Sequence, residues 1–65
     1  MISVRSSVIS AIDYDADLLI LYIKFTSGAI YKYYRVPESV FNGLVNARSK
    51  GTYFNLRIKE RYRSS

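Results

Sequence analysis

The sequence predicts an α+β domain in which a three-stranded antiparallel meander is followed by two C-terminal helices that cover one face of the sheet. Apolar and β-branched residues alternate through residues 7–36, as in half-buried strands. Beyond Pro37, the spacing of the apolar residues changes to that of a helix. The 65 residues suffice for one small domain, so we expect residues 1–65 to form a single unit with frayed ends at residues 1–5 and 63–65.

The first strand is expected over residues 7–14, which are rich in β-branched side chains. A polar turn follows, marked by Asp13, Asp15 and Asp17. Carboxylates at alternate positions resemble a calcium loop, but Leu18 and Lys24 stand where an EF-hand needs glycine and glutamate. We therefore expect a solvated turn, with no metal and no cofactor.

Residues 18–25 and 29–36 are expected to form a hairpin. Its loop is Thr26, Ser27 and Gly28, a type I turn followed by a left-handed glycine. The register that places the apolar side chains on one face pairs Phe25 with Ala29, Ile23 with Tyr31, Leu21 with Tyr33, and Leu19 with Arg35. A shift of one residue would expose this apolar set, so the pattern favours this register.

The opposite face of the hairpin mixes aromatic and basic side chains. Tyr22 and Lys24 lie on one strand of this face, and Lys32 and Tyr34 lie on the other. Both tyrosines are candidates for stacking on single-stranded bases, and ordinary cross-strand pairing is the alternative. The aromatic residues expected to face the core are Phe25, Tyr31, Tyr33, Phe41 and Phe54.

The first helix is expected to start at Pro37, with Glu38 at the positive end of its dipole, and to run to about Ala47. Its apolar side, which can cover the sheet, consists of Val40, Phe41, Leu44 and Val45. Gly43 lies inside this helix at a cost of about 1 kcal/mol relative to alanine, which indicates close approach to another backbone.

A second, short helix is expected from the cap residue Ser49 to about Lys59, with Phe54 and Ile58 one turn apart. Arg57 and Arg61 repeat the same spacing on another stripe. The helix start Ser49-Lys50-Gly51 is a candidate phosphate site, because free N–H groups and the helix dipole favour an anion there. The alternative is that Ser49 caps the helix and Gly51 forms a turn.

The basic residues are concentrated in the last third of the chain. The net charge is +5, and residues 1–45 balance to zero. Residues 46–65 hold six basic residues against the single acid Glu60. Such a segment is typical of a protein that binds a polyanion, and a solvated surface that only aids solubility is the alternative.

Several classes of function are not expected from this composition. Without cysteine or histidine there is no disulfide framework, no thiolate nucleophile and no usual zinc site. The acids Glu38 and Glu60 have no evident partner for acid–base catalysis, so we expect no enzyme. The longest apolar run, residues 18–23, is far shorter than the roughly 20 residues of a membrane span, so we expect no membrane association and a cytoplasmic location.

Two runs of residues carry a resemblance to a known family. They are Tyr31, Tyr33, Val36 and Pro37, followed by Ser49, Lys50, Gly51, Tyr53, Phe54, Asn55, Ile58, Arg61 and Tyr62. Their order and spacing resemble the KTSC domain, named for the C-terminus of certain lysyl-tRNA synthetases and also found as small proteins of bacteria and their viruses. The chain departs from the pattern at Thr52 and Leu56, where more polar residues are expected. The resemblance implies a three-stranded sheet with C-terminal helices and a role with nucleic acid, RNA being favoured.

We therefore expect a non-catalytic nucleic-acid-binding module, with Lys50, Arg57 and Arg61 on the phosphate backbone. The full candidate surface is Arg48, Lys50, Arg57, Lys59, Arg61, Tyr22, Lys24, Lys32 and Tyr34. The alternative is a protein-interaction module, for example a phage or host effector, that docks on an acidic surface or adds a strand at a sheet edge. The expected state is a monomer, or a weak homodimer through the first or third strand.

Overall fold

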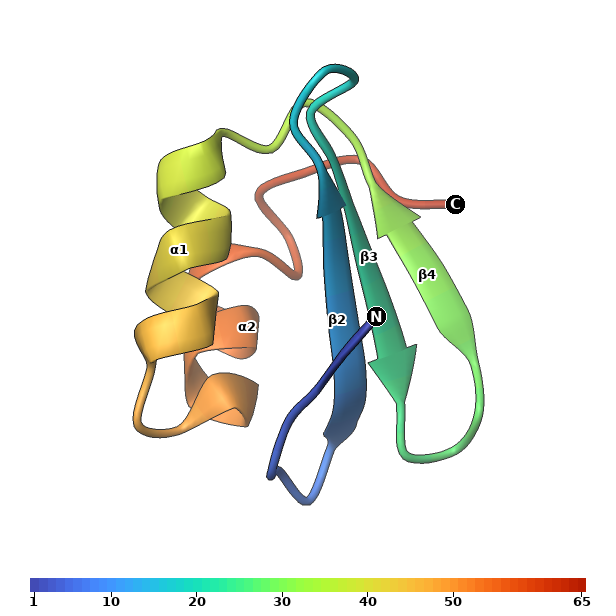
Figure 1. Ribbon diagram of the computed structural model, residues 1–65, viewed down its shortest axis with the longest axis vertical. Helices are drawn as coiled ribbons and strands as arrows, with labels where there is room; N and C mark the ends of the chain where they lie inside the picture. Colours follow the sequence, from blue (N-terminus) through green and yellow to red (C-terminus); the bar gives the residue numbers. More distant parts are fainter.

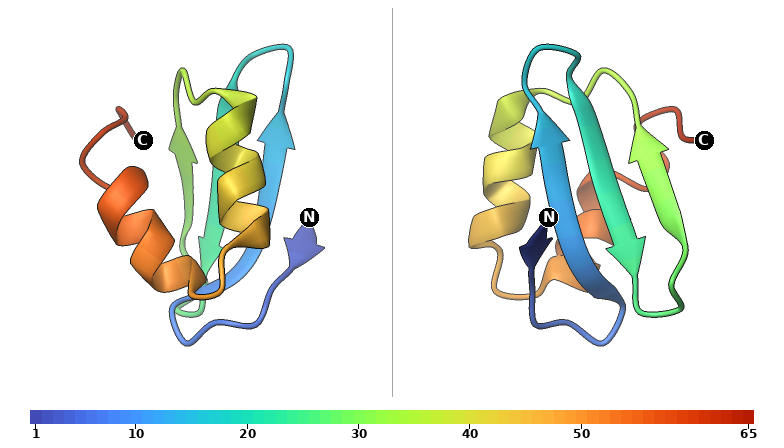
Figure 2. Two further views of the ribbon diagram at one scale, coloured as in Figure 1. Left: turned by 90° about the vertical axis from the view of Figure 1, so that its left-hand side faces the viewer. Right: turned by 45° about the vertical axis from the view of Figure 1, so that its right-hand side comes forward.

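The computed structural model describes all residues from 1 to 65 as one antiparallel sheet and two helices. The elements are β1 (Ile2–Ser3), β2 (Ile9–Asp15), β3 (Ile20–Phe25), β4 (Ile30–Tyr33), α1 (Glu38–Asn46) and α2 (Lys50–Arg57). The sheet order is β1-β2-β3-β4, and both helices lie over the same face of the sheet (Figures 1 and 2). The predicted α+β class is confirmed, with four strands instead of three. Neither helix is long and apolar enough to cross a membrane.

The N-terminal end is paired, although fraying was expected. Ile2 pairs with Ile12 and Ser3 with Ala11, which makes β1 an edge strand beside β2. The N–H of Val4 extends this pairing by donating to the carbonyl of Ser10 over 3.1 Å. A two-residue strand is too short to show an alternating pattern, so the sequence carried no sign of it.

The C-terminal tail, residues 63–65, is also paired and does not fray. It lies along β4, where Tyr33 and Ser64 form an antiparallel bridge. The N–H of Tyr34 donates to the carbonyl of Arg63 over 2.9 Å, and the N–H of Ser65 donates to that of Lys32 over 3.0 Å. The two chain ends therefore cover part of each edge of the expected three-stranded sheet.

The hairpin between β3 and β4 has the predicted register over most of its length. Leu21 pairs with Tyr33 and Ile23 with Tyr31. Gly28 has φ 98°, in the left-handed region where glycine is favoured, as the three-residue loop requires. Leu21 and Ile23 are fully buried, so the apolar pattern did select the register.

The expected pairing of Leu19 with Arg35 is wrong. β3 begins at Ile20 and β4 ends at Tyr33, and the chain leaves the sheet at both positions. Leu19 has φ 56° and Arg35 has φ 57°, the only non-glycine residues with positive φ. The N–H of Val36 donates to the carbonyl of Leu19 over 2.9 Å, so this junction carries two left-handed residues of types that disfavour that region.

The turn between β2 and β3 begins later than expected, because β2 includes Asp13 and Asp15. The Oδ1 atom of Asp15 accepts the N–H groups of Asp17 and Leu18, at 3.0 and 3.1 Å. This is the local hydrogen bonding by which aspartate stabilises a turn.

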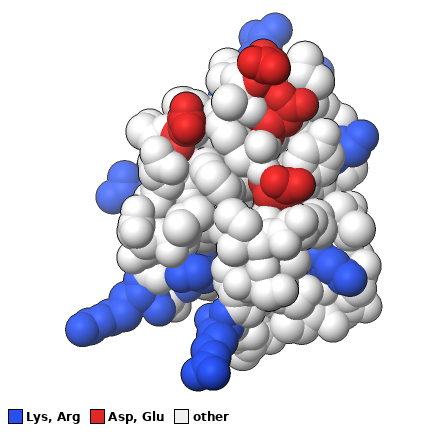
Figure 3. Space-filling model, in the orientation of Figure 1, with Lys and Arg blue, Asp and Glu red and all other residues white.

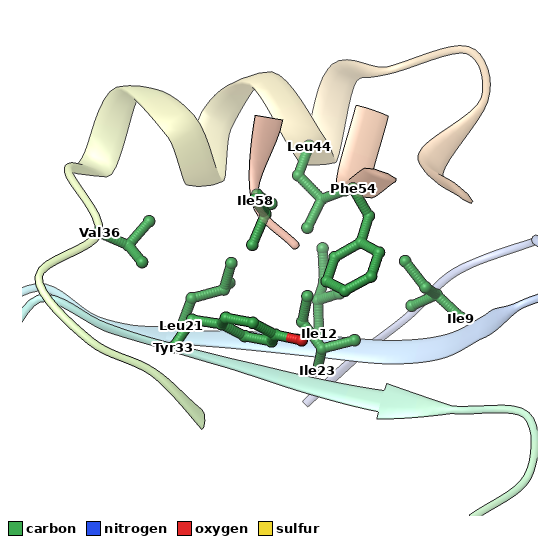
Figure 4. Close-up of a cluster of buried hydrophobic side chains, with 9 residues drawn as sticks. All are labelled: Ile9, Ile12, Leu21, Ile23, Tyr33, Val36, Leu44, Phe54 and Ile58. Atoms are coloured by element: carbon green, nitrogen blue, oxygen red, sulfur yellow. The ribbon is translucent and has the colours of Figure 1, made fainter. Parts of the chain in front are cut away.

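The core lies between the sheet and the two helices (Figure 4). Its buried residues are Ile9, Ile12, Leu21, Ile23, Tyr33, Val36, Leu44, Phe54 and Ile58. The ring of Phe54 meets Phe25 and Tyr33 edge-on, at centroid distances of 5.4 and 5.6 Å. Tyr31, expected in the core, is 43% exposed because it lies on the outer strand beyond the part that the tail covers.

Both helices begin as predicted, but α2 ends early. The Oγ atom of Ser49 accepts the N–H of Thr52 over 3.3 Å, so Ser49 is the cap. The last residue of α2 is Arg57 instead of Lys59, and Ile58 has φ −125° and lies in the core. Arg61 therefore does not continue the stripe of Arg57.

Tyr14 links the sheet to the start of α1. Its hydroxyl donates to the carbonyl of Val36 over 2.5 Å. Its ring stacks on Phe41, with centroids 5.0 Å apart and an interplanar angle of 11°. This combination fixes the position of α1 on the sheet.

Tyr14→Phe is expected to lower the free energy of unfolding at pH 7 by about 1 kcal/mol, because the carbonyl of Val36 loses its donor while the ring stack remains.

Burial, followed by the charges of Glu38 and Asp15, raises the pKa of Tyr14 in the folded protein. Burial and Tyr31 likewise raise the pKa of Tyr33. A raised folded pKa means that stability is full below about pH 10 and is lost as the pH rises through the folded values.

Urea unfolding at pH 7, and again at a pH above the pKa of free tyrosine, checks both the lost hydrogen bond and the pH dependence of stability. The wild type should lose more stability than the variant between the two conditions, since Tyr33 alone still contributes in the variant. An equal loss in the two proteins would contradict the role given to the Tyr14 hydroxyl.

Candidate nucleic-acid interface

A basic cleft with a volume of 420 Å³ lies between the turn after β4 and the segment that follows α2. We call it the arginine cleft, and its lining residues are Tyr34, Arg35, Arg61, Tyr62 and Arg63. Three of its five residues carry a guanidinium group, and none carries a carboxylate. The cleft therefore presents positive charge next to two aromatic rings.

Main-chain pairing brings the two walls of the cleft together. The bond from Tyr34 N–H to the Arg63 carbonyl holds the tail against the end of β4. The hydroxyl of Tyr34 also donates to the Oγ atom of Ser65 over 3.1 Å, which ties one aromatic ring to the tail. Arg35 follows directly, has a left-handed backbone and also lines the cleft. The cleft is thus built from two segments far apart in the sequence.

Arg61 is held in place by its own segment. Its N–H donates to the carbonyl of Ile58 over 3.1 Å, and its Nε atom donates to the carbonyl of Leu56 over 3.1 Å. These bonds fix the side chain while its two terminal nitrogens keep their donors for a ligand. A fixed guanidinium loses less conformational entropy when it binds an anion than a freely rotating one.

The charges are unevenly distributed over the molecule. On the face shown in Figure 3, the acidic side chains gather in the upper half, toward the β2–β3 turn and the start of α1. The basic side chains lie mainly in the lower half and along the edges of this face. A polyanion is therefore repelled from the acidic end and attracted to the remaining surface.

The predicted C-terminal basic residues do not form one continuous surface. Arg48 and Arg57 line a shallow hollow of 280 Å³ beside Tyr53. Lys59 lies at a third hollow, of 520 Å³, next to the hairpin loop. Of the predicted C-terminal set, only Arg61 lies in the arginine cleft, because α2 ends before it.

The helix start at Ser49 agrees with one part of the structural alternative, the cap, but not with the expected turn at Gly51. Ser49 caps the helix, and the Nζ atom of Lys50 donates to the carbonyl of Ala47 over 2.8 Å. Gly51 lies inside α2 and not in a turn, and a Cβ there would meet Val8 at 3.6 Å. The ammonium of Lys50 is thus engaged within the chain.

The four candidates that were predicted on the sheet face lie in two different regions of the structure. Tyr22 and Lys24 alternate with the buried Leu21 and Ile23, and Lys32 pairs with Tyr22, so all three lie on the opposite face of the sheet. No helix covers that face (Figure 2). The Nζ atom of Lys32 lies 5.9 Å from the ring centroid of its cross-strand partner Tyr22, a cation–π contact. Tyr34 instead lines the arginine cleft.

Three of the cleft residues were not predicted from the sequence as binding residues: Arg35, Tyr62 and Arg63. Arg35 was assigned to strand pairing and Arg63 to a frayed end. The signal that could have found them is the pair of short basic-aromatic runs, Tyr34-Arg35 and Arg61-Tyr62-Arg63.

These features define a small α+β domain with a basic, aromatic cleft beside the outer strand of its sheet. The chain belongs to the KTSC domain family, whose model matches residues 5–62. This confirms the resemblance found in the sequence.

Similar proteins come from bacteria. A protein of Tsukamurella paurometabola is 46% identical over 61 residues, which are 94% of this chain and 91% of that protein. A lysine–tRNA ligase of Nostoc punctiforme is 42% identical over 59 residues, 91% of this chain but only 10% of the ligase. The crystal structure of a KTSC domain protein from Yersinia pestis has a TM-score of 0.95 and 36% identity, covering 97% of this chain and 89% of that one.

Proposed function

We propose that this domain is a non-catalytic, cytoplasmic module that binds single-stranded nucleic acid, RNA by preference, through the arginine cleft. The observation that carries the proposal is one cleft that is lined by three arginines and two tyrosines and by no carboxylate. Guanidinium groups match phosphate oxygens with paired hydrogen bonds, and aromatic rings stack on unpaired bases. Such side chains are suited to holding a strand.

Two further facts support RNA as the ligand. The net charge of +5 favours association with any polyanion. Relatives of this chain include lysine–tRNA ligases, whose name states that they act on a tRNA. A domain appended to such an enzyme is well placed to contact RNA, and we carry this role over to the present chain.

Titration of labelled single-stranded RNA, tRNA and duplex DNA at several salt concentrations tests the proposal. If the three arginines of the cleft neutralise about three phosphates, the logarithm of the binding constant should fall with the logarithm of the salt concentration with a slope of about −2 for a single strand. Single-stranded RNA should bind more tightly than duplex DNA of the same length. Binding that does not change with salt, or no binding at low salt, would contradict the proposal.

A further inference from the structure

The arginine cleft has the size of a small-ligand pocket. Its volume of 420 Å³ lies toward the lower end of the range of about 300–1,000 Å³ typical of such pockets. A long strand is bound along a groove, with its charges spread over many contacts. A cleft closed on one side by the C-terminal tail instead suits a single nucleotide unit.

The number of guanidinium groups indicates which phosphate fits. A phosphodiester inside a strand carries one negative charge. A terminal phosphomonoester carries about −1.5 to −2 at pH 7 and has three acceptor oxygens. Three arginines with no lining carboxylate match the terminal group better, because each of its three oxygens can accept from one guanidinium group and its higher negative charge leaves less positive charge uncompensated.

The backbone of Arg35 is a second, independent observation. Its φ of 57° lies in a region that disfavours arginine, and unfavourable backbone conformations cluster at ligand sites. The side chain of Arg35 is exposed, while the next residue, Val36, is fully buried and its N–H donates to the carbonyl of Leu19. The turn at Arg35 therefore brings Val36 into the core and leaves the arginine side chain outside it. Arg35 lines the cleft together with Arg61 and Arg63.

We infer that the arginine cleft binds the terminal phosphomonoester of a nucleotide unit, with Arg35 as the residue that determines selectivity for it. The rings of Tyr34 and Tyr62 then flank the adjoining base or ribose. This inference rests on the proposed function, which it narrows from any strand to a strand end. A free mononucleotide carries the same terminal phosphate group, so it is the second ligand that could supply this group to the cleft.

The test compares one short RNA in three forms: with a 5′-phosphate, with a 3′-phosphate, and with hydroxyl groups at both ends. One phosphorylated form should bind about 10- to 100-fold more tightly than the unphosphorylated form at the same salt concentration. Equal affinities would overturn this inference and leave the proposed function standing. No binding of any of the three RNAs would overturn the proposed strand-binding function.

A competition experiment with a mononucleoside monophosphate distinguishes the phosphate of a strand end from that of a free mononucleotide. Displacement of the RNA only at much higher concentrations supports a strand end as the ligand. Tight binding of the mononucleotide without any binding of RNA would support the phosphate site but overturn the proposed strand-binding function. Inorganic phosphate serves as the reference for the charge alone.

Arg35→Gly tests the role of the side chain without straining the backbone, because glycine favours the left-handed region. The variant should stay folded and lose the preference for the phosphorylated RNA. Leu19→Gly is the matched control, since Leu19 has the same backbone conformation but does not line the cleft. Arg35→Asn gives a second variant that tolerates this region. A preference that survives in both Arg35 variants would overturn the assignment.

Discussion

Replacing Arg35, Arg61 and Arg63 together by glutamine is expected to weaken binding of single-stranded RNA by more than about 100-fold, because each lost charge-assisted hydrogen bond is worth about 1.5–3 kcal/mol. The matched control replaces three basic residues outside the cleft, Lys24, Lys32 and Arg57, by glutamine as well. Both variants lose three positive charges, which lowers the net charge from +5 to +2. The control should bind less than about 10-fold more weakly than the wild type, since only long-range attraction is reduced.

Binding assays by fluorescence anisotropy at one salt concentration compare the three proteins. Circular dichroism and urea unfolding establish that both variants keep the fold, which glutamine favours by preserving most of each side chain. Equal losses in the two variants would mean that the affinity comes from net charge alone. The arginine cleft would then have no special role.

Gly43→Ala is expected to be among the most destabilising single changes in the domain. A Cβ at Gly43 would clash with the Oη atom of Tyr53 and would lie 2.6 Å from its Cζ atom. The ring has to move, and its hydroxyl then loses the 3.1 Å bond to the carbonyl of Val40. Overpacking and the lost hydrogen bond should together cost about 2–4 kcal/mol, and the better helix propensity of alanine offsets about 1 kcal/mol of this. The net loss should be about 1–3 kcal/mol, out of about 3–10 kcal/mol for a domain of this size.

A double-mutant cycle separates this clash from an effect on the helix alone. In a Tyr53→Ala background, the space next to Gly43 is empty, and alanine is a better helix former than glycine by about 1 kcal/mol. Gly43→Ala should therefore be nearly neutral or stabilising in that background. If urea unfolding gives the same loss in both backgrounds, contact with Tyr53 is not the reason for the glycine.

This contact also shows how far the sequence could predict the fold. Glycine inside a helical pattern indicated close approach, and the structure confirms it. The approaching group is the side chain of Tyr53 and not a backbone, which the helix pattern alone does not distinguish. The hairpin register and the Ser49 cap were predictable because alternation, turn chemistry and capping are local.

The errors have a common physical cause. β1 and the C-terminal tail are two or three residues long, and they pair only because β2 and β4 offer free edges. The end of α2 depends on Ile58 reaching the core, which propensity does not reveal. Tyr34 and Arg61 were candidates, but Arg35 and Arg63 meet them only after the tail has folded over β4. Because tertiary pairing assembles this site, the sequence indicates that basic and aromatic residues are present but not which of them come together.

The decisive experiment is NMR mapping of the ¹⁵N-labelled domain with a short single-stranded RNA at low salt. We predict that the amide shifts that change most belong to residues 34–35 and 61–65, the two walls of the arginine cleft. The amides around Tyr22 and Lys24 on the sheet face, and around Arg48, should change little. Changes centred on either of those regions, with the cleft unaffected, would contradict the proposal that this family member holds nucleic acid between β4 and its C-terminal tail.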